Sequence, residues 1–285
     1  MSAPGAAPED PRRVLRRYDL GAKKSWGQNF LVARGVVERI VAAADAGAAD
    51  VVLEIGAGLG TLTATLAAPP APAAPPRRVI AVEREPDMLM VLRGELAGAG
   101  NVEIVAADAA AVDLAAVAAA AGRPLIVVGN LPYQIASPIL FRLLETRGAI
   151  ARIVVMLQKE MADRIVAPPG EKAYGALSVM VRFYGTPKLV CRVRAGGFVP
   201  APRVDSAVLR IVPHAARPAV DEQQFSRVVH AAFGQRRKTL RNALSAAFDA
   251  GVVDGALAAA SIDGQRRGET LSVDEFVALT KALDA

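Results

Sequence analysis

The sequence predicts an α/β protein with a doubly wound, mainly parallel sheet of seven strands, followed by a small all-helical C-terminal domain. Two observations support this fold class. Short runs of uninterrupted apolar residues alternate with helical patterns, which is typical of strands covered by helices on both faces. From about residue 221 onward no strand signal remains. The expected strands cover residues 51–55, 79–82, 102–105, 125–128, 153–157, 188–193 and 207–212.

The apolar spacing between and after these strands predicts helices and a division into three parts. The expected helices are one that begins at about Val36 and others over residues 59–66, 87–96 and 176–183. The three parts are a flexible basic arm at 1–20, an α/β domain at 21–215 and a helical domain at 216–285. The segment 67–76, which is rich in alanine and proline, fits a surface loop without an assigned function.

Composition excludes several classes of protein. The longest uncharged stretch, residues 55–76, contains glycines and prolines that would break a membrane-spanning helix, and the N-terminus lacks the apolar core of a signal peptide. Cys191 is the single cysteine, so no internal disulfide forms, and no cluster of cysteine and histidine is present that could hold a metal ion. We therefore expect a cytoplasmic protein with no membrane attachment and no bound metal.

The net charge of +6 is unevenly distributed, with one basic cluster in residues 12–24 and another in residues 236–241. Such clusters are typical of nucleic-acid binders, although a solvated helix face and a charged tail would give the same pattern. The second cluster is predicted to lie on a helix, where Arg237 and Arg241 share one face because they are four residues apart. We expect this face to grip phosphates through Arg236, Arg237, Lys238 and Arg241.

A glycine-rich loop, residues 56–60, follows the first expected strand. Glycines at such a turn let the backbone pass close to a ligand and leave the N–H groups of the next helix exposed. Glu83 ends the second strand, where a carboxylate can accept hydrogen bonds from both hydroxyls of a ribose. Asp108 follows the third strand, where it can accept from an adenine amine. We predict one nucleoside-binding crevice formed by Gly56, Gly58, Glu83 and Asp108.

The tetrapeptide Asn130-Leu131-Pro132-Tyr133 directly follows the fourth expected strand. The lone pair of an exocyclic adenine amine is delocalised into the ring, so methyl transfer needs acceptors that hold the amine hydrogens and favour a pyramidal nitrogen. The Asn130 side-chain oxygen and the Leu131 carbonyl are the predicted acceptors. Pro132 stiffens the turn, and Tyr133 offers a flat face to an extruded base. The plainer interpretation of this tetrapeptide is a turn that only ends a strand.

The order of these features resembles the class I methyltransferases that use S-adenosylmethionine. A dehydrogenase is the competing interpretation, because nicotinamide enzymes also carry a glycine loop. Their G-x-x-G spacing is absent here, since Thr61 occupies the position of the last glycine. The resemblance implies a Rossmann-like class I methyltransferase fold, S-adenosylmethionine as the cofactor, and Asn130 as a residue that contacts both cofactor and substrate.

Further motifs resemble those of the ribosomal RNA adenine dimethyltransferases. N-L-P-Y differs from the N-P-P-Y that is typical of DNA-adenine and glutamine-amide methyltransferases. The other matching segments are KKSWGQNFL at 23–31, QKE at 158–160, YGALSV at 174–179 and GFVPAPRVDS at 197–206. The resemblance implies that Asn29 and Leu31 contact the cofactor. It also implies that Phe198 stacks on the target adenine, on the side opposite Tyr133.

Within this family, segments 197–206 and 234–242 resemble the bacterial housekeeping branch. That resemblance implies dimethylation of two adjacent adenines in a hairpin loop near the 3′ end of 16S rRNA, and a role in ribosome biogenesis. The expected partner is 16S rRNA or the immature small subunit, and we expect a monomer. Two alternatives stay open. One is the antibiotic-resistance branch, which modifies large-subunit rRNA, and the other is an RNA-binding assembly factor without activity.

Overall fold

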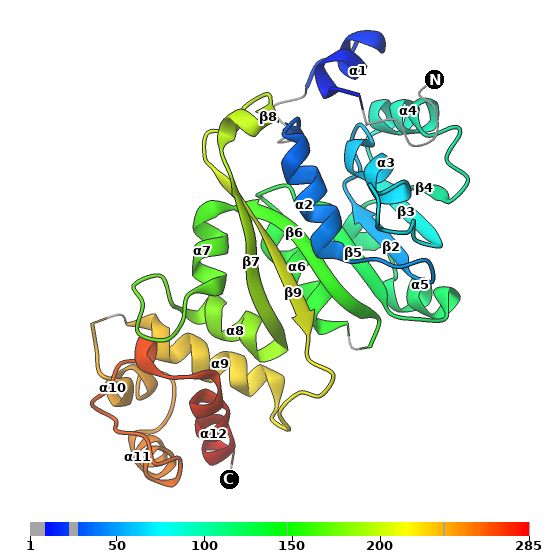
Figure 1. The fold of residues 1–285 in the computed structure, drawn as a ribbon. Coiled ribbons are helices and arrows are strands. Elements are labelled where there is room, and N and C mark those ends of the chain that lie inside the picture. Colours follow the sequence, from blue (N-terminus) through cyan, green and yellow to red (C-terminus); the bar gives the residue numbers. More distant parts are fainter. Residues whose placement is uncertain (1–8, 23–27, 147, 236, 285) are drawn as a thin grey trace. The chain divides into compact units, whose positions relative to one another are not determined.

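The computed structural model describes residues 9–22, 28–146, 148–235 and 237–284 (Figure 1). Within these residues the chain forms a mainly parallel sheet of seven strands, which confirms the predicted α/β class. Every strand that the sequence predicts is present, with small shifts at the ends. The strands are β2 (Val51–Ile55), β3 (Arg78–Glu83), β4 (Val102–Ala106), β5 (Leu125–Asn130), β6 (Ile150–Gln158), β7 (Gly185–Val193) and β9 (Ser206–Pro213).

The order of strands across the sheet determines where a ligand can bind. This order is β4-β3-β2-β5-β6-β9-β7. The strands from β4 to β6 run parallel, and β9 runs antiparallel to β6. From β2 the chain adds β3 and β4 on one side, and then returns to add β5 and β6 on the other. Ligands of open α/β sheets bind outside the carboxyl ends of the strands at such a switch point. The topology therefore predicts a crevice at the ends of β2 and β5.

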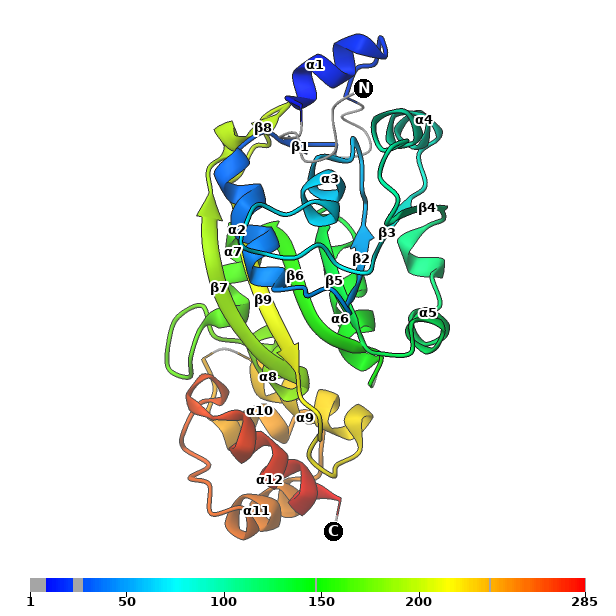
Figure 2. The same ribbon diagram turned by 45° about the vertical axis from the view of Figure 1, so that its right-hand side comes forward.

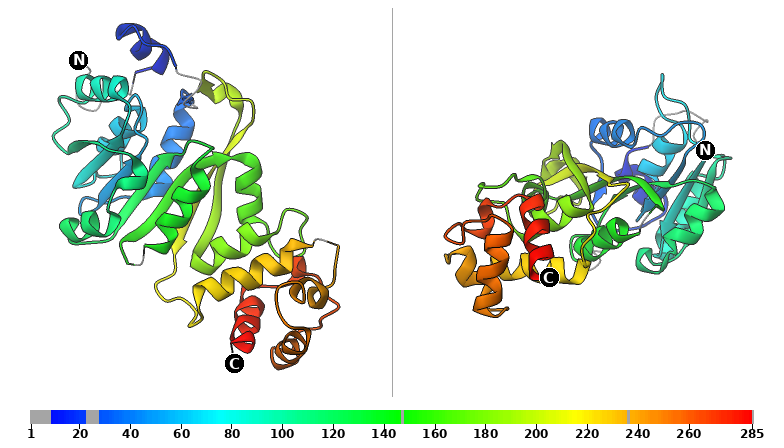
Figure 3. Two further views of the ribbon diagram at one scale, coloured as in Figure 1. Left: turned by 180° about the vertical axis from the view of Figure 1, so that it is seen from behind. Right: turned by 90° about the horizontal axis from the view of Figure 1, so that it is seen from below.

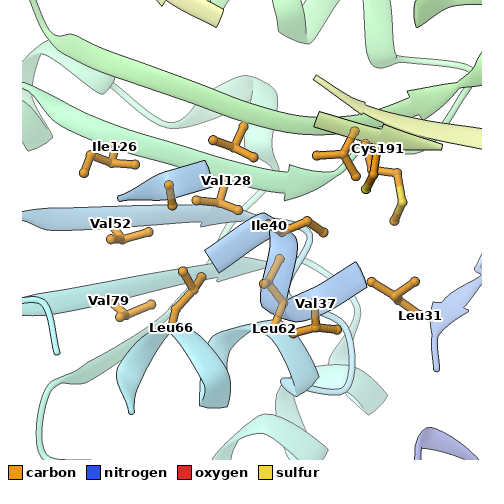
Figure 4. Packing of buried hydrophobic residues seen from close by; sticks show 14 of the residues in the cluster. Leu31, Val37, Ile40, Val52, Leu62, Leu66, Val79, Ile126, Val128 and Cys191 are labelled. Atoms are coloured by element: carbon orange, nitrogen blue, oxygen red, sulfur yellow. The ribbon is translucent and has the colours of Figure 1, made fainter. Parts of the chain in front are cut away.

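Helices α2 (Arg34–Ala44) and α3 (Thr61–Ala67) pack on one face of the sheet (Figure 2). Their apolar residues form a buried cluster with side chains of the strands (Figure 4). Cys191 lies in this cluster and is 6% exposed, so it is a core residue. Full burial of one such leucine or isoleucine contributes about 1.5–3 kcal/mol. The cluster includes Val37, Ile40, Val52, Leu62, Leu66, Val79, Ile126 and Val128.

Helix α6 (Ala136–Glu145) covers the opposite face next to β6 (Figure 3). Pro138 lies in its first turn, where a missing N–H removes no helical hydrogen bond. The sequence predictions include neither this helix nor α5 (Leu114–Ala121), and only α5 lacks an apolar periodicity, because it is largely a run of alanines. The ends of α5 are set locally, by the Asp113 side chain at its N-terminus and by Gly122 in the left-handed region at its C-terminus.

Helix α1 (Pro11–Arg17) lies where the sequence indicates a flexible arm. Asp10 caps its first turn, and proline at the first helical position is pre-organised for a helix. Val14 and Leu15 are buried against Leu59 and against the residues Met88 and Val91 of helix α4 (Pro86–Glu95). A cap and a short apolar anchor therefore order this segment, and its proline-rich, basic composition hides both signals.

The chain divides into two compact units, residues 1–162 with 188–213 and residues 163–187 with 214–285. Residues 163–187, which the sequence groups with the α/β domain, pack in the helical core of the second unit. There the Phe183 ring stacks on Phe225, with ring centroids 4.1 Å apart. The remaining helices are α7 (Lys159–Val166), α8 (Ala176–Tyr184), α9 (Glu222–Gly234), α10 (Leu240–Leu244), α11 (Ala250–Ala259) and α12 (Val273–Leu283). Among the helices described here, none is long and apolar enough to cross a membrane.

Candidate active site

A crevice of about 180 Å³ opens at the carboxyl ends of β2, β3, β4 and β5, at the switch point of the sheet. All of its lining residues belong to the first unit. They include most of the residues that the sequence predicts for the cofactor and for the methyl acceptor. These predicted residues are Asn29, Leu31, Gly56, Gly58, Glu83, Asp108, Asn130, Leu131, Pro132 and Tyr133.

The glycine loop after β2 has a backbone that favours glycine. Gly56 and Gly58 have φ angles of +73° and +55°, a region that L side chains rarely adopt. A Cβ at Gly58 would also lie 3.4 Å from the Phe30 ring. The positive φ angles therefore favour glycine at both positions, and Gly58 lies close to the Phe30 ring.

The Glu83 carboxylate is fixed at the end of β3 by backbone N–H groups. Its Oε2 accepts from Gly58 at 2.9 Å, and its Oε1 accepts from Arg84 at 2.8 Å and from Glu85 at 2.9 Å. A carboxylate has about four acceptor positions, so three of them are already used. The glycine loop and the end of β3 are thereby held together, and Oε2 keeps the capacity to accept from a ribose hydroxyl.

Asp108 lies two residues beyond the end of β4. Its Oδ1 accepts from the backbone N–H of Ala110 at 2.8 Å, and its Oδ2 pairs with the Arg84 guanidinium at 2.9 Å. The Ala110 hydrogen bond and the Arg84 guanidinium hold the pKa of Asp108 below its usual range. Asp108 is therefore ionised at neutral pH, which makes it an acceptor suited to an adenine amine.

Glu54 is a buried carboxyl in the crevice that the sequence predictions missed. It lies on β2 with only 2% of its surface exposed, and its Oε2 accepts from the Thr63 hydroxyl at 2.6 Å. Burial raises the pKa of Glu54 to about 8, since the hydrogen bond from Thr63 offsets only part of the loss of hydration. The feature of the sequence that could have revealed Glu54 is an acidic residue within an otherwise apolar strand, directly before the glycine loop.

Asn130 ends β5 and faces the glycine loop across a very close backbone contact. A Cβ at the preceding Gly129 would lie 2.8 Å from the Ile55 carbonyl oxygen, so only glycine fits there. The Asn130 Nδ2 donates to the Asn29 carbonyl at 3.1 Å. Because the amide nitrogen is used in this way, Oδ1 is the atom of Asn130 that can accept from an amine. The segment predicted to cover the cofactor thus orients the predicted catalytic amide.

The rest of the tetrapeptide forms a turn into α6. The Leu131 N–H donates to the Met156 carbonyl of β6 at 3.3 Å, and the Leu131 side chain is buried. The Pro132 carbonyl accepts from the Ile135 N–H at 3.1 Å, which closes the turn. Tyr133 lines the crevice from this turn, and its hydroxyl lies 2.8 Å from the Ser206 hydroxyl.

The structure does not bring Phe198 into the crevice. Strand β8 (Phe198–Val199) pairs antiparallel with β1 (Phe30–Leu31), and Phe198 is 2% exposed in the cluster that contains Leu31 and Cys191. Phe198 therefore lies in the core beside Leu31, a residue that lines the crevice. Its stacking on the target adenine stays a prediction, and it requires the β1–β8 pair to rearrange.

The basic segment of the second unit differs from its prediction. Residues 234–242 do not form one helix, because α9 ends at Gly234 and Thr239 caps the start of α10. The shared helix face inferred for Arg237 and Arg241 is therefore wrong. Arg237 and Lys238 are exposed in the intervening turn, whereas Arg241 forms a two-point ion pair with Asp254, at 2.5 and 2.6 Å. Arg236 lies outside the described residues.

The residues of the crevice fit S-adenosylmethionine. The glycines form a cradle whose positive φ angles disfavour a side chain, Glu83 and Asp108 present fixed acceptors, and Asn130 follows on the neighbouring strand. The fold and this crevice define a class I methyltransferase that uses S-adenosylmethionine. Residues 20–285 match the protein family described as ribosomal RNA adenine dimethylase, and the chain belongs to this family.

Individual relatives agree with this assignment. Ribosomal RNA small subunit methyltransferase A of Anaeromyxobacter dehalogenans (strain 2CP-C) is 47% identical over 284 residues, which cover 96% of this chain and 97% of the relative. The crystal structure of a dimethyladenosine transferase from Plasmodium falciparum has a TM-score of 0.74 at 25% identity, and covers 88% of this chain and 95% of that chain. The 23S rRNA methyltransferase ErmE has a TM-score of 0.69 at 27% identity, and covers 90% of this chain and 100% of that chain.

Proposed function

We propose that the protein dimethylates the N6 amines of two adjacent adenines in a hairpin loop near the 3′ end of 16S rRNA. It acts as a monomer in the cytoplasm, during biogenesis of the small ribosomal subunit. The observation that carries this proposal is the Asn130 amide, which is held by the Asn29 carbonyl at the crevice that fits S-adenosylmethionine. The relative that is 47% identical, named for the small subunit, supports the small-subunit branch over the large-subunit one.

The chemistry of the site follows from its acceptors. S-adenosylmethionine supplies the methyl group. The Asn130 Oδ1 and the Leu131 carbonyl hold the hydrogens of the adenine amine, so that its lone pair is directed at the methyl carbon. The Tyr133 ring supports the extruded base. No strong base is needed, because the amine proton becomes acidic once the nitrogen is alkylated. Alignment of this kind can supply about 7–11 kcal/mol of the barrier.

The second unit is proposed to contact the RNA outside the target loop. Arg237 and Lys238 lie exposed in one turn, as phosphate contacts require. Arg236 precedes them in the sequence. Arg241 is proposed as a further contact, although Asp254 neutralises it in this structure. These cations would position the rRNA through its backbone without reading its sequence.

Incubation with methyl-labelled S-adenosylmethionine tests the proposed function. The substrates are immature small subunits, naked 16S rRNA and naked 23S rRNA, and the modified nucleotides are mapped by mass spectrometry. We expect N6,N6-dimethyladenosine at two adjacent positions near the 3′ end of 16S rRNA. Modification of 23S rRNA would instead support the antibiotic-resistance branch. Incorporation into none of the substrates would favour an assembly factor without activity.

A further inference from the structure

A pair of hydroxyl groups connects the N-L-P-Y turn to a distant segment of the first unit. The Tyr133 and Ser206 hydroxyls lie 2.8 Å apart, although the two residues are separated by 73 positions in the chain. Tyr133 lines the crevice, whereas Ser206 is fully buried at the start of β9. Burying a hydroxyl without a hydrogen-bond partner costs free energy of folding. The contact with Tyr133 supplies that partner, so it stabilises the buried Ser206 hydroxyl and the position of the tyrosine together.

Ser206 belongs to a rigid part of the sheet. It pairs with Gln158 in the ladder between β6 and β9. The preceding residue, Asp205, makes two hydrogen bonds that fix its position. Its backbone carbonyl accepts from the backbone N–H of Lys159 at 2.9 Å, and its carboxylate accepts from the backbone N–H of Ala195 at 3.0 Å. Tyr133 instead lies on a turn between β5 and α6. The Ser206 hydroxyl therefore links the end of the tyrosine side chain to a fixed point on the sheet.

The two methyl transfers to one adenine place different demands on this ring. An unmodified amine has two hydrogens, one for each acceptor at Asn130 and Leu131. After the first transfer only one hydrogen remains, so one acceptor loses its donor. The orientation of the base then depends more on the surface on which it stacks.

Resting on the proposed function, we propose that Ser206 is a positioning residue for the second methyl transfer. Its hydroxyl fixes the Tyr133 ring, and the fixed ring keeps the monomethylated base aligned. Ser206 does not touch the base, and it acts only through the tyrosine. The residue therefore determines whether the reaction proceeds from monomethyladenosine to dimethyladenosine.

The test is a double-mutant cycle with S206A, Y133F and the double variant, run under single-turnover conditions on the rRNA that the wild type methylates. Nucleoside mass spectrometry follows N6-monomethyladenosine and N6,N6-dimethyladenosine with time. In each variant we expect the second transfer to slow about fivefold more than the first, so that monomethyladenosine accumulates. The double variant should be no slower than either single variant, because all three lose the same contact.

The matched control is Ser137→Ala, which removes an exposed serine hydroxyl on α6 that contacts the Met161 sulfur at 3.9 Å. Its product ratio should equal that of the wild type. Y133F removes only a hydroxyl from a half-buried ring, so it keeps the test decisive if S206A fails to fold. Equal slowing of both transfers, additive effects, or an unchanged product ratio in Y133F would overturn the proposal. A wild type that makes no dimethyladenosine would overturn the proposed function, and this inference with it.

Discussion

The crevice of the first unit and the basic segment 234–242 of the second unit were both predicted from short motifs, and they differ in how their residues are held. In the crevice, backbone groups fix the key side chains: Glu83 accepts from three N–H groups, and Asn130 donates to a carbonyl. In the basic segment, Arg237 lies exposed in a turn, and a carboxylate of its own unit holds Arg241.

The crevice and the basic segment differ because different parts of the structure determine where their residues lie. The ends of parallel strands meet at one edge because the sheet forces them to, so spacing along the sequence becomes proximity in space. The end of a helix depends on a single local residue, such as Gly234 or the capping Thr239. Motifs at strand ends therefore predict a site more securely than a run of charges on an expected helix.

Asn130→Ala gives the largest expected effect, because it removes the acceptor that is proposed to align the adenine amine. Turnover should fall about 100- to 1,000-fold, which is typical for the loss of one transition-state hydrogen bond. The affinity for S-adenosylmethionine should stay within about a few-fold, since most of the cofactor contacts would remain. Methyl incorporation and isothermal titration calorimetry measure the two quantities.

The matched control for Asn130→Ala is Asn101→Ala, which removes the same side chain from a site where it bonds the Ala67 and Pro76 carbonyls. This variant should keep its turnover. An N130A enzyme that remained fully active would contradict the role given to the tetrapeptide.

Gly58→Ala tests whether the loop must be glycine. The new side chain would meet both an unfavourable φ of +55° and the Phe30 ring at 3.4 Å. We expect the affinity for S-adenosylmethionine to fall about tenfold or more, as backbone strain of this size predicts. Gly35→Ala is the control, because nothing lies within 4 Å of the added Cβ. Equal affinities of the two variants in calorimetry would show that the loop is not a cradle.

Glu54→Gln tests the buried carboxyl. The pKa of Glu54 is about 8 in the folded protein and 4.5 in its ordinary state, so the folded chain binds more protons between these values. The wild-type free energy of unfolding should therefore fall as pH rises through this window, by about 1 kcal/mol per pH unit, and level off above it. Glutamine does not titrate, so the variant should have a flatter profile. Urea unfolding between pH 5 and 8 measures both profiles. If the free energy of unfolding of the wild type and of Glu54→Gln changed with pH in parallel, the raised pKa of Glu54 would be contradicted.

The smallest expected effects concern the second unit. Asp254→Asn should release Arg241 and raise the affinity for rRNA a few-fold, and it should steepen the salt dependence by about one released counterion. The double variant Arg237→Ala with Lys238→Ala should lower the affinity for rRNA and make its salt dependence less steep. Lys281→Ala, on α12, serves as a control that removes one positive charge elsewhere in the same unit. Affinities that do not respond to Asp254→Asn at any salt concentration would exclude Arg241 as an RNA contact.

Much of the fold and of the crevice follows from the sequence, for reasons that particular residues show. Apolar runs mark the strands, and Glu83, Asp108 and Asn130 lie where those strands end. Two features are hidden from composition. Helix α1 depends on the Asp10 cap, and the role proposed for Ser206 depends on its contact with Tyr133, which lies 73 positions away in the chain.

The central claim is that the crevice at Asn130 carries out dimethylation of 16S rRNA. Its most direct test is mass spectrometry of rRNA from cells that lack this gene, complemented with the wild type or with Asn130→Ala. We expect N6,N6-dimethyladenosine near the 3′ end of 16S rRNA to disappear on deletion, to return with the wild type and to stay absent with the variant. Full dimethylation in the deletion strain, or its return with Asn130→Ala, would contradict the claim.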